Sequence, residues 1–141
     1  MEKAAPEGPG QEASVQSILV VEDSATMRSL IASTLEELGP GVKITEASSG
    51  FEALRLLPRG AFHLIVTDIN MPDINGLELV SFVKKNPAYA AIPLIIVSTE
   101  SSERDREKGI GLGADAYLVK PFEPEDLRGL ARDLLNAREE A

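Results

Sequence analysis

The chain has 141 residues and no cysteine, which fits one domain with its own core and excludes disulfides and thiolate metal sites. No apolar run approaches the roughly 20 residues of a membrane span, and residues 1–16 hold no signal-peptide core, so we expect a cytoplasmic protein. The formal charge of −9 repels nucleic acid and anionic membranes, so we expect a protein or a cation as partner, and neither nucleic acid nor membrane.

The first third of the chain predicts a tail, a strand, a helix and a second strand. Residues 1–16 are rich in Pro, Gly and Glu and poor in large apolar groups, so we expect a disordered N-terminal tail. Residues 18–21 form an apolar strand that ends on Glu22-Asp23. A helix over about 25–38 follows and stops at Gly39-Pro40, with an apolar face of Met27, Leu30, Ile31, Leu35 and Leu38. The alternation over 42–46 indicates an edge strand.

The middle third predicts two helices around a buried strand. Ser49 and Glu52 have the spacing of a capping box, which indicates a short helix that ends near Pro58 and buries Phe51, Leu54 and Leu57. The apolar run from residue 64 is a strand that ends on Asp68. Asn75 and Glu78 are expected to cap the next helix, which ends before Asn86-Pro87 and buries Leu77, Val80 and Val83.

The last third predicts two strands and two helices. Residues 94–97 form a strand that ends on Ser98, and residues 116–119 form one that ends on Lys120-Pro121. The segment 102–112 connects them as a helix, yet only Ile110 and Leu112 can be buried, and Gly109 and Gly111 each cost about 1 kcal/mol relative to alanine. We expect that helix to be marginal and mobile. The last helix has Pro124 in its first turn and buries Leu127, Leu130, Ala131, Leu134 and Leu135.

Five strands that alternate with five helices predict an α/β domain with a parallel sheet. Right-handed crossovers bring the C-terminal ends of all strands to one rim, where polar residues should therefore gather: Glu22, Asp23, Asp68, Ser98 and Lys120. Two carboxylates about 5 Å apart repel by about 3 kcal/mol at an effective dielectric of about 20. One lysine leaves part of this negative charge uncompensated, and a set of oxygen ligands favours Mg²⁺ as the further counter-charge.

A site of this composition is suited to phosphoryl transfer. A carboxylate can act as the nucleophile and become an acyl phosphate. A metal ion and Lys120 can neutralise charge on the transferring group, and Ser98 can donate a hydrogen bond to one of its oxygens.

Four segments, in order and in spacing, resemble the response-regulator receiver family, and most closely its single-domain chemotaxis (CheY) type. They are residues 19–24, 68–78, 96–100 and 117–122, and the resemblance covers about residues 17–137. It implies a doubly wound, flavodoxin-like sheet in the order 2-1-3-4-5, for which the chemotaxis regulator is a known example. It also implies a receiver domain over 17–137, between the tail 1–16 and a C-terminal tail over 138–141.

The resemblance implies a phosphoacceptor and a metal site. Asp68 would accept a phosphoryl group from the phosphohistidine of a sensor histidine kinase. Glu22, Asp23, Asp68 and the backbone carbonyl of Asn70 would hold Mg²⁺. Glu22 replaces the aspartate of many members, and we expect it to act through a metal-bound water. Asn70 and Glu100 match positions that tune self-dephosphorylation in the family.

The resemblance further implies a switch. Ser98 and Tyr117 match the switch hydroxyl and aromatic, and Lys120 matches the phosphate-contacting lysine, with a cis peptide bond before Pro121. Phosphorylation adds about two negative charges at pH 7, so Ser98 moves to bond the new oxygens and Tyr117 turns inward. The face formed by residues 102–137 then changes shape for a downstream target protein, through a shift of population.

We therefore predict a phosphorylation-controlled switch of two-component signalling, a monomer or weak dimer that catalyses only its own Mg²⁺-dependent phosphorylation and dephosphorylation. Its alternatives within the family are a phosphate sink, a phosphorelay intermediate, or a module that acts unphosphorylated. A phosphatase of the haloacid dehalogenase kind needs its nucleophilic Asp on the first strand and a second acid two residues later, whereas Asp68 is followed two residues on by Asn70. A flavodoxin-like flavin binder needs a phosphate cradle where Glu22-Asp23 would repel phosphate.

Overall fold

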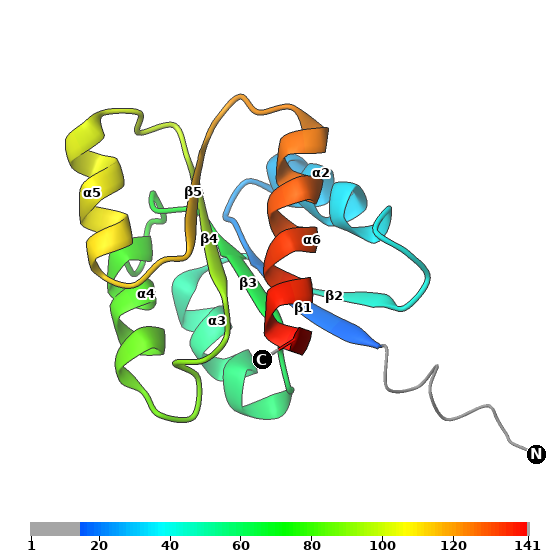
Figure 1. Cartoon of the computed structure of the whole chain (residues 1–141). Coiled ribbons are helices and arrows are strands. Elements are labelled where there is room, and N and C mark those ends of the chain that lie inside the picture. The colour runs from blue at the N-terminus through cyan, green and yellow to red at the C-terminus, as the bar shows by residue number, and fades with distance from the viewer. Residues whose placement is uncertain (1–14, 141) are drawn as a thin grey trace, which may run out of the picture.

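The computed structural model describes residues 15–140, which form a five-stranded parallel sheet between two layers of helices (Figure 1). The strands are β1 (Gln16–Val21), β2 (Val42–Ala47), β3 (Leu64–Thr67), β4 (Leu94–Ser98) and β5 (Ala116–Val119). The helices are α2 (Ala25–Glu36), α3 (Gly50–Leu56), α4 (Gly76–Lys85), α5 (Glu103–Gly111) and α6 (Pro124–Glu140), with a 3₁₀ turn η1 (Leu57–Arg59). None of these described helices is long and apolar enough to cross a membrane.

The strand order is β2-β1-β3-β4-β5, which confirms the predicted order and the edge position of β2. Each neighbouring pair is parallel, so the C-terminal ends of all five strands lie at one rim of the sheet. The residues that follow the strands are therefore brought together by topology alone.

Two separate apolar clusters fill the spaces on either side of the sheet. In β1, Leu19 and Val21 pack with residues of α3 and α4, whereas Ile18 and Val20 pack with residues of α2 and α6. Figure 1 shows the same division, with α2 and α6 over one face and α3, α4 and α5 over the other. Strands covered on both faces need apolar side chains at every position, which explains the continuous apolar runs of the sequence.

The helices after the rim begin with side-chain caps. At α4 the capping box is complete, because the Asn75 side chain accepts the N–H of Leu77 (2.7 Å) and the Glu78 carboxylate accepts the N–H of Asn75 (3.2 Å). At α3 it is only half formed: Ser49 Oγ accepts the N–H of Glu52 (3.1 Å), but the Glu52 carboxylate accepts from the backbone and hydroxyl of Ser48 instead of Ser49. The predicted box at Ser49 is therefore half right.

Three apolar residues that we expected in the core are exposed: Leu30 by 43%, Phe51 by 57% and Ile110 by 41%. Each lies on the border of a helix face, where the apolar stripe is wider than the strip that the sheet covers. In α5 the buried position is taken by Gly109, and Ile110, about 100° further around the helix, turns to solvent. The expected mobility of α5 stays a prediction.

Several element ends differ from expectation by a few residues. Helix α2 ends at Glu36 instead of 38, because Leu38 and Gly39 donate to Leu35 and Glu36 in a tighter turn that leads to Gly39 at φ 151°. Helix α6 continues to Glu140, so it enters the expected C-terminal tail over 138–141. In the expected tail over 1–16, Gln16 already belongs to β1, and residues 1–14 lie outside the described residues.

Candidate functional site

Three carboxylates meet at the rim where β1 and β3 end. Val21 and Thr67 are register partners on these strands, so Glu22 and Asp68, the next residue on each, stand side by side. Oxygens of Glu22, Asp23 and Asp68 lie within 4.8 Å of one another. Glu22 and Asp68 are only 1% and 6% exposed, whereas Asp23 is open to solvent. The predicted acidic cluster thus has two buried members and one exposed member.

The ammonium group of Lys120 provides the positive charge nearest to this cluster. Its Nζ lies 2.8 Å from Glu22 Oε1 and 3.5 Å from Asp68 Oδ2. Burial raises the pKa of the Glu22 carboxyl, although hydrogen bonds from Lys120 and from the Ser24 backbone oppose that shift. One ammonium cannot balance three carboxylates, and the converging donors are all oxygens, so the residues present fit a hard divalent cation.

The two oxygens of Asp68 have different surroundings. Oδ1 accepts the backbone N–H groups of Ile69 (2.7 Å) and Asn70 (3.3 Å), while Oδ2 faces Lys120. The first oxygen is therefore fixed by the loop, and the second points toward the positive charge. This arrangement suits a nucleophile whose reacting oxygen is held beside a cation.

The backbone around Asp68 is packed closely by residues that the sequence did not single out. Thr67 Oγ1 donates to the carbonyl oxygen of Asp68 (2.9 Å), and the N–H of Gly76 donates to the carbonyl of Ile69 (2.8 Å). A Cβ on Gly76 would overlap the Asp68 carbonyl oxygen, so only glycine allows α4 to start this close to the site.

Arg28 is another site neighbour that sequence reasoning missed. Its Nη1 donates to the backbone carbonyl of Glu22 (2.8 Å), and its Nε pairs with Glu46 at 3.1 Å. Arg28 lies one turn into α2, whose N-cap Ser24 directly follows Glu22-Asp23. A basic residue one helical turn after the acid pair is a signal that could have found it.

The other predicted site residues form an adjoining cluster around Glu100. Buried Ser98 accepts the Glu100 N–H at its Oγ (3.0 Å), and the Glu100 carboxylate accepts the Asn70 side-chain amide (3.4 Å). The Tyr117 hydroxyl donates to the Glu100 carbonyl (2.7 Å). The cis peptide bond predicted before Pro121 is present. The loop after β4 thus connects the loop after Asp68 with β5.

The Tyr117 side chain is buried in this structure. It is 5% exposed and belongs to the apolar cluster on the α3–α4–α5 side of the sheet. Burial raises the pKa of its phenol above the ordinary value of 10.0. The switch roles of Ser98 and Tyr117 stay predictions.

A clamp between two loops holds the segment after Asp68. Asp73 Oδ1 accepts from the backbone of Ile74 (2.7 Å) and Gly50 (3.2 Å), and Oδ2 accepts from the backbone of Phe51 (2.9 Å). Gly50 and Phe51 begin α3, so the carboxylate joins that helix to the loop that carries Asn70. No local sequence pattern indicates this role of Asp73, because its partners on α3 are more than 20 residues away.

This clamp predicts an acid-sensitive part of the stability. Hydrogen bonds from the backbone, above all from Phe51, lower the pKa of Asp73 from 3.8 to about 2. As the pH falls, the unfolded chain binds this proton first, so the contribution is complete above about 3.8 and is lost as the pH falls toward 2. Asp73→Asn should therefore unfold at lower urea than the parent at pH 7, and the difference should shrink between pH 4 and pH 2. A difference that is independent of pH would contradict the clamp.

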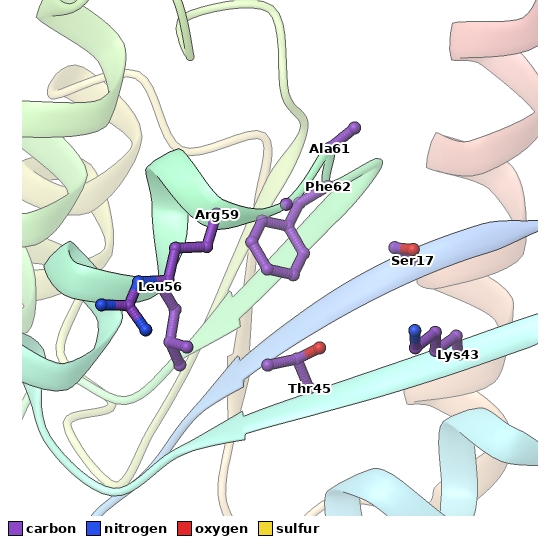
Figure 2. A pocket seen from close by; sticks show the side chains of 8 residues that line it. Ser17, Lys43, Thr45, Leu56, Arg59, Ala61 and Phe62 are labelled. Atoms are coloured by element: carbon purple, nitrogen blue, oxygen red, sulfur yellow. The ribbon is translucent and has the colours of Figure 1, made fainter.

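A cavity of about 170 Å³ lies at the opposite end of the sheet, with Ser17, Lys43, Arg59 and Phe62 in its lining (Figure 2). Ser17 and Lys43 stand near the starts of β1 and β2, whereas Glu22 follows the end of β1. No residue predicted for the site lines this cavity. The candidate site is therefore the rim and not this hollow.

Comparison with known proteins gives consistent relatives. The sequence model described as "Response regulator receiver domain" matches residues 18–132. A Chemotaxis protein CheY homolog of Campylobacter jejuni is 40% identical over 119 residues, which cover 84% of this chain and 91% of that protein. The chemotaxis response regulator CheY4 of Vibrio cholerae has 32% identity and a TM-score of 0.77, over 85% of this chain and 98% of that one.

A second similar structure is the response regulator Rcp1 in its Mn²⁺-bound form, with 25% identity and a TM-score of 0.72, over 84% of this chain and 91% of that one. The family model covers most of the chain. Chemotaxis regulators are found both among the sequence relatives of this chain and among the structures similar to it. With five parallel strands in the order β2-β1-β3-β4-β5 and an acidic cluster at their ends, the chain belongs to the response regulator receiver family, the signalling switches of two-component systems.

Proposed function

We propose that Asp68 is the phosphoacceptor of this receiver and that its phosphorylation controls a protein-binding face. The observation that carries the proposal is the position of Asp68 Oδ2, 3.5 Å from Lys120 Nζ and within a cluster of three carboxylates. An acid that ends a strand for structural reasons alone would need neither the lysine nor two further acids beside it.

The reaction follows from the groups at the site. Asp68 Oδ2 attacks the phosphorus of a phosphohistidine, a new O–P bond forms, the P–N bond breaks, and the imidazole leaves with the electron pair and takes a proton. Lys120 stands where it can stabilise the negative charge of the transferring group. The phosphodonor in this proposal is a sensor histidine kinase.

Glu22, Asp23, Asp68 and the backbone carbonyl of Asn70 would hold Mg²⁺. A bound divalent cation would neutralise charge on the phosphoryl oxygens. The all-oxygen donor set and the excess of negative charge support a hard cation at this place, and the Mn²⁺-bound form of the similar regulator Rcp1 supports a divalent one. Glu22 is already bonded to Lys120 through Oε1, which favours a contact through a metal-bound water for this longer side chain.

Signal output would start at the loop that carries Glu100. Ser98 would turn its hydroxyl to the phosphoryl oxygens and release the Glu100 N–H that it now accepts. Because the Tyr117 hydroxyl holds the carbonyl of the same residue, the change would reach β5 and the face over 102–137, where a downstream protein binds. Asn70 and Glu100, whose side chains are hydrogen-bonded to each other, would tune the lifetime of the phosphoryl group.

The test is labelling of the full chain by a small phosphodonor, with and without Mg²⁺, followed by peptide mapping. We expect a Mg²⁺-dependent acyl phosphate confined to the peptide that contains Asp68. Labelling elsewhere, or labelling that does not need a divalent cation, would refute the assignment. Release of phosphate from an added phosphomonoester would instead revive the phosphatase alternative.

A pull-down with phosphorylated and unphosphorylated chain separates the output roles. A switch binds a target protein in one state only, whereas a phosphate sink or relay intermediate exchanges its phosphoryl group without such a target. A cytoplasmic location, and a monomer or weak dimer, belong to the same proposal and are tested by cell fractionation and by sedimentation.

A further inference from the structure

Helix α5 packs on the sheet through very little apolar surface. Gly109 is its one buried residue, and Ile110 is 41% exposed. The helix lies beside β5 (Figure 1), and its main contacts within the sheet are with that strand. The place where Gly109 meets the sheet therefore decides how α5 is seated.

Two side chains of the sheet lie directly against Gly109. A Cβ on this residue would lie 2.7 Å from Cδ1 of Ile96 and 3.3 and 3.4 Å from two ring carbons of Tyr117. Ile96 and Tyr117 are register partners on β4 and β5, and Ile96 is completely buried. A methyl group at 109 would overlap the end of the Ile96 side chain and press on the Tyr117 ring, so these two side chains must shift or α5 must lift from the sheet.

The second glycine of the helix has no such surroundings. A Cβ on Gly111 would meet nothing within 4 Å. Each glycine lowers helix stability by about 1 kcal/mol relative to alanine. At Gly109 this loss is offset by the close approach of α5 to the ring, whereas no contact compensates for it at Gly111.

The Tyr117 ring also joins Gly109 to the candidate site. Its hydroxyl donates to the Glu100 carbonyl, and the Glu100 N–H donates to Ser98. The ring is thus fixed at one end by the loop after β4 and along its side by Gly109. The loop also continues along the chain into α5 through the N-cap Ser102, so the ring is a second contact between the loop and the helix, at Gly109.

We propose that Gly109 is the positioning residue that admits the Tyr117 ring to its inward place beneath α5, and that it thereby sets how closely the helix follows the loop after β4. A response of α5 to phosphorylation would depend on the proposed function of Asp68. The seating of the ring itself does not.

The test compares Gly109→Ala with Gly111→Ala in the full chain, each in a Tyr89→Phe background that leaves Tyr117 as the only tyrosine. The phenol is titrated by its ultraviolet absorbance, and amide exchange is followed along α5. With Gly109→Ala we expect the pKa of Tyr117 to fall toward the ordinary value of about 10 and exchange in α5 to accelerate. With Gly111→Ala we expect the same pKa as the background and slower exchange.

A rescue variant separates the steric effect from general damage. Ile96→Val removes the Cδ1 atom that a side chain at 109 would meet first. Added to Gly109→Ala, it should return the pKa of Tyr117 toward the raised value of the background. Equal behaviour of Gly109→Ala and Gly111→Ala, or a rescue that leaves the pKa low, overturns the positioning role.

Phosphodonor labelling of the same proteins keeps the two proposals apart. If the background protein is not labelled at Asp68, the proposed function fails, while the titrations still decide the role of Gly109. If it is labelled, we expect phosphorylation to slow or speed exchange in α5 of the background protein, with a smaller change in Gly109→Ala. An equal change in both would overturn the transmission from ring to helix.

Discussion

The Asp68→Asn variant is expected to take up no phosphoryl group from a small phosphodonor in the presence of Mg²⁺, while it keeps the fold of the parent. The amide nitrogen is no nucleophile at neutral pH, but the amide oxygen can still accept the N–H groups of Ile69 and Asn70. Loss of one negative charge relieves repulsion from Glu22 and Asp23, which offsets the lost attraction to Lys120. Labelling should therefore vanish with no fall in the free energy of unfolding.

The measurement is incorporation of the label by intact mass, beside a urea unfolding curve for each protein. Asp133→Asn, which changes an exposed acid on α6, is the matched control and should be labelled like the parent. Labelling of Asp68→Asn at the parental rate would show that another acid is the phosphoacceptor. Glu22 and Asp23 lie in the same cluster and would be tested next.

Replacement of Gly76 by alanine is expected to be among the most damaging single-methyl additions in the chain, with a loss of about 3 kcal/mol or more in the free energy of unfolding. The added Cβ would overlap the Asp68 carbonyl oxygen and lie 2.6 Å from Cα of Ile69. Both are backbone atoms beside a buried strand, so no side-chain rotation can relieve the overlap. The same shift would displace Asp68, and labelling should slow as well.

Gly111→Ala serves as the control for this variant, because it adds the same methyl group to a helix where nothing lies within 4 Å. It should gain up to about 1 kcal/mol. The readouts are urea unfolding and the initial rate of labelling under conditions where each variant is folded. Equal stabilities of Gly76→Ala and Gly111→Ala would mean that α4 can move away from Asp68 at little cost.

Much of the fold could be predicted from local patterns, because strands covered on both faces must be apolar throughout and end where polar residues begin. The meeting of Glu22 with Asp68 needed one further fact, the adjacency of β1 and β3, which came from the resemblance to the receiver family. Topology then brings each polar strand end to the same rim.

The features that could not be predicted depend on contacts between elements that are distant in the sequence, including how much of each helix the sheet covers. Helical periodicity gives the direction of an apolar face but not the width that the sheet covers, so Phe51 was placed inside although it is 57% exposed. The clamp at Asp73 joins side chain and backbone across 22 and 23 residues, a distance that no local pattern encodes. Gly109 was read as a weakness of its helix because its ring neighbour on β5 is unknown until the chain is folded.

The unequal burial of the three acids affects how a bound cation would exchange with the solvent. Glu22 and Asp68 are enclosed, but Asp23 faces water, so a divalent cation held by the three acids, as we propose, would enter and leave past this side chain without any unfolding. Structural zinc sites differ, since there the metal is gained and lost with the fold itself. The fraction of protein with a bound cation should therefore follow the free concentration of divalent cations. The rate at which the proposed site accepts a phosphoryl group would then depend on that concentration as well as on the protein.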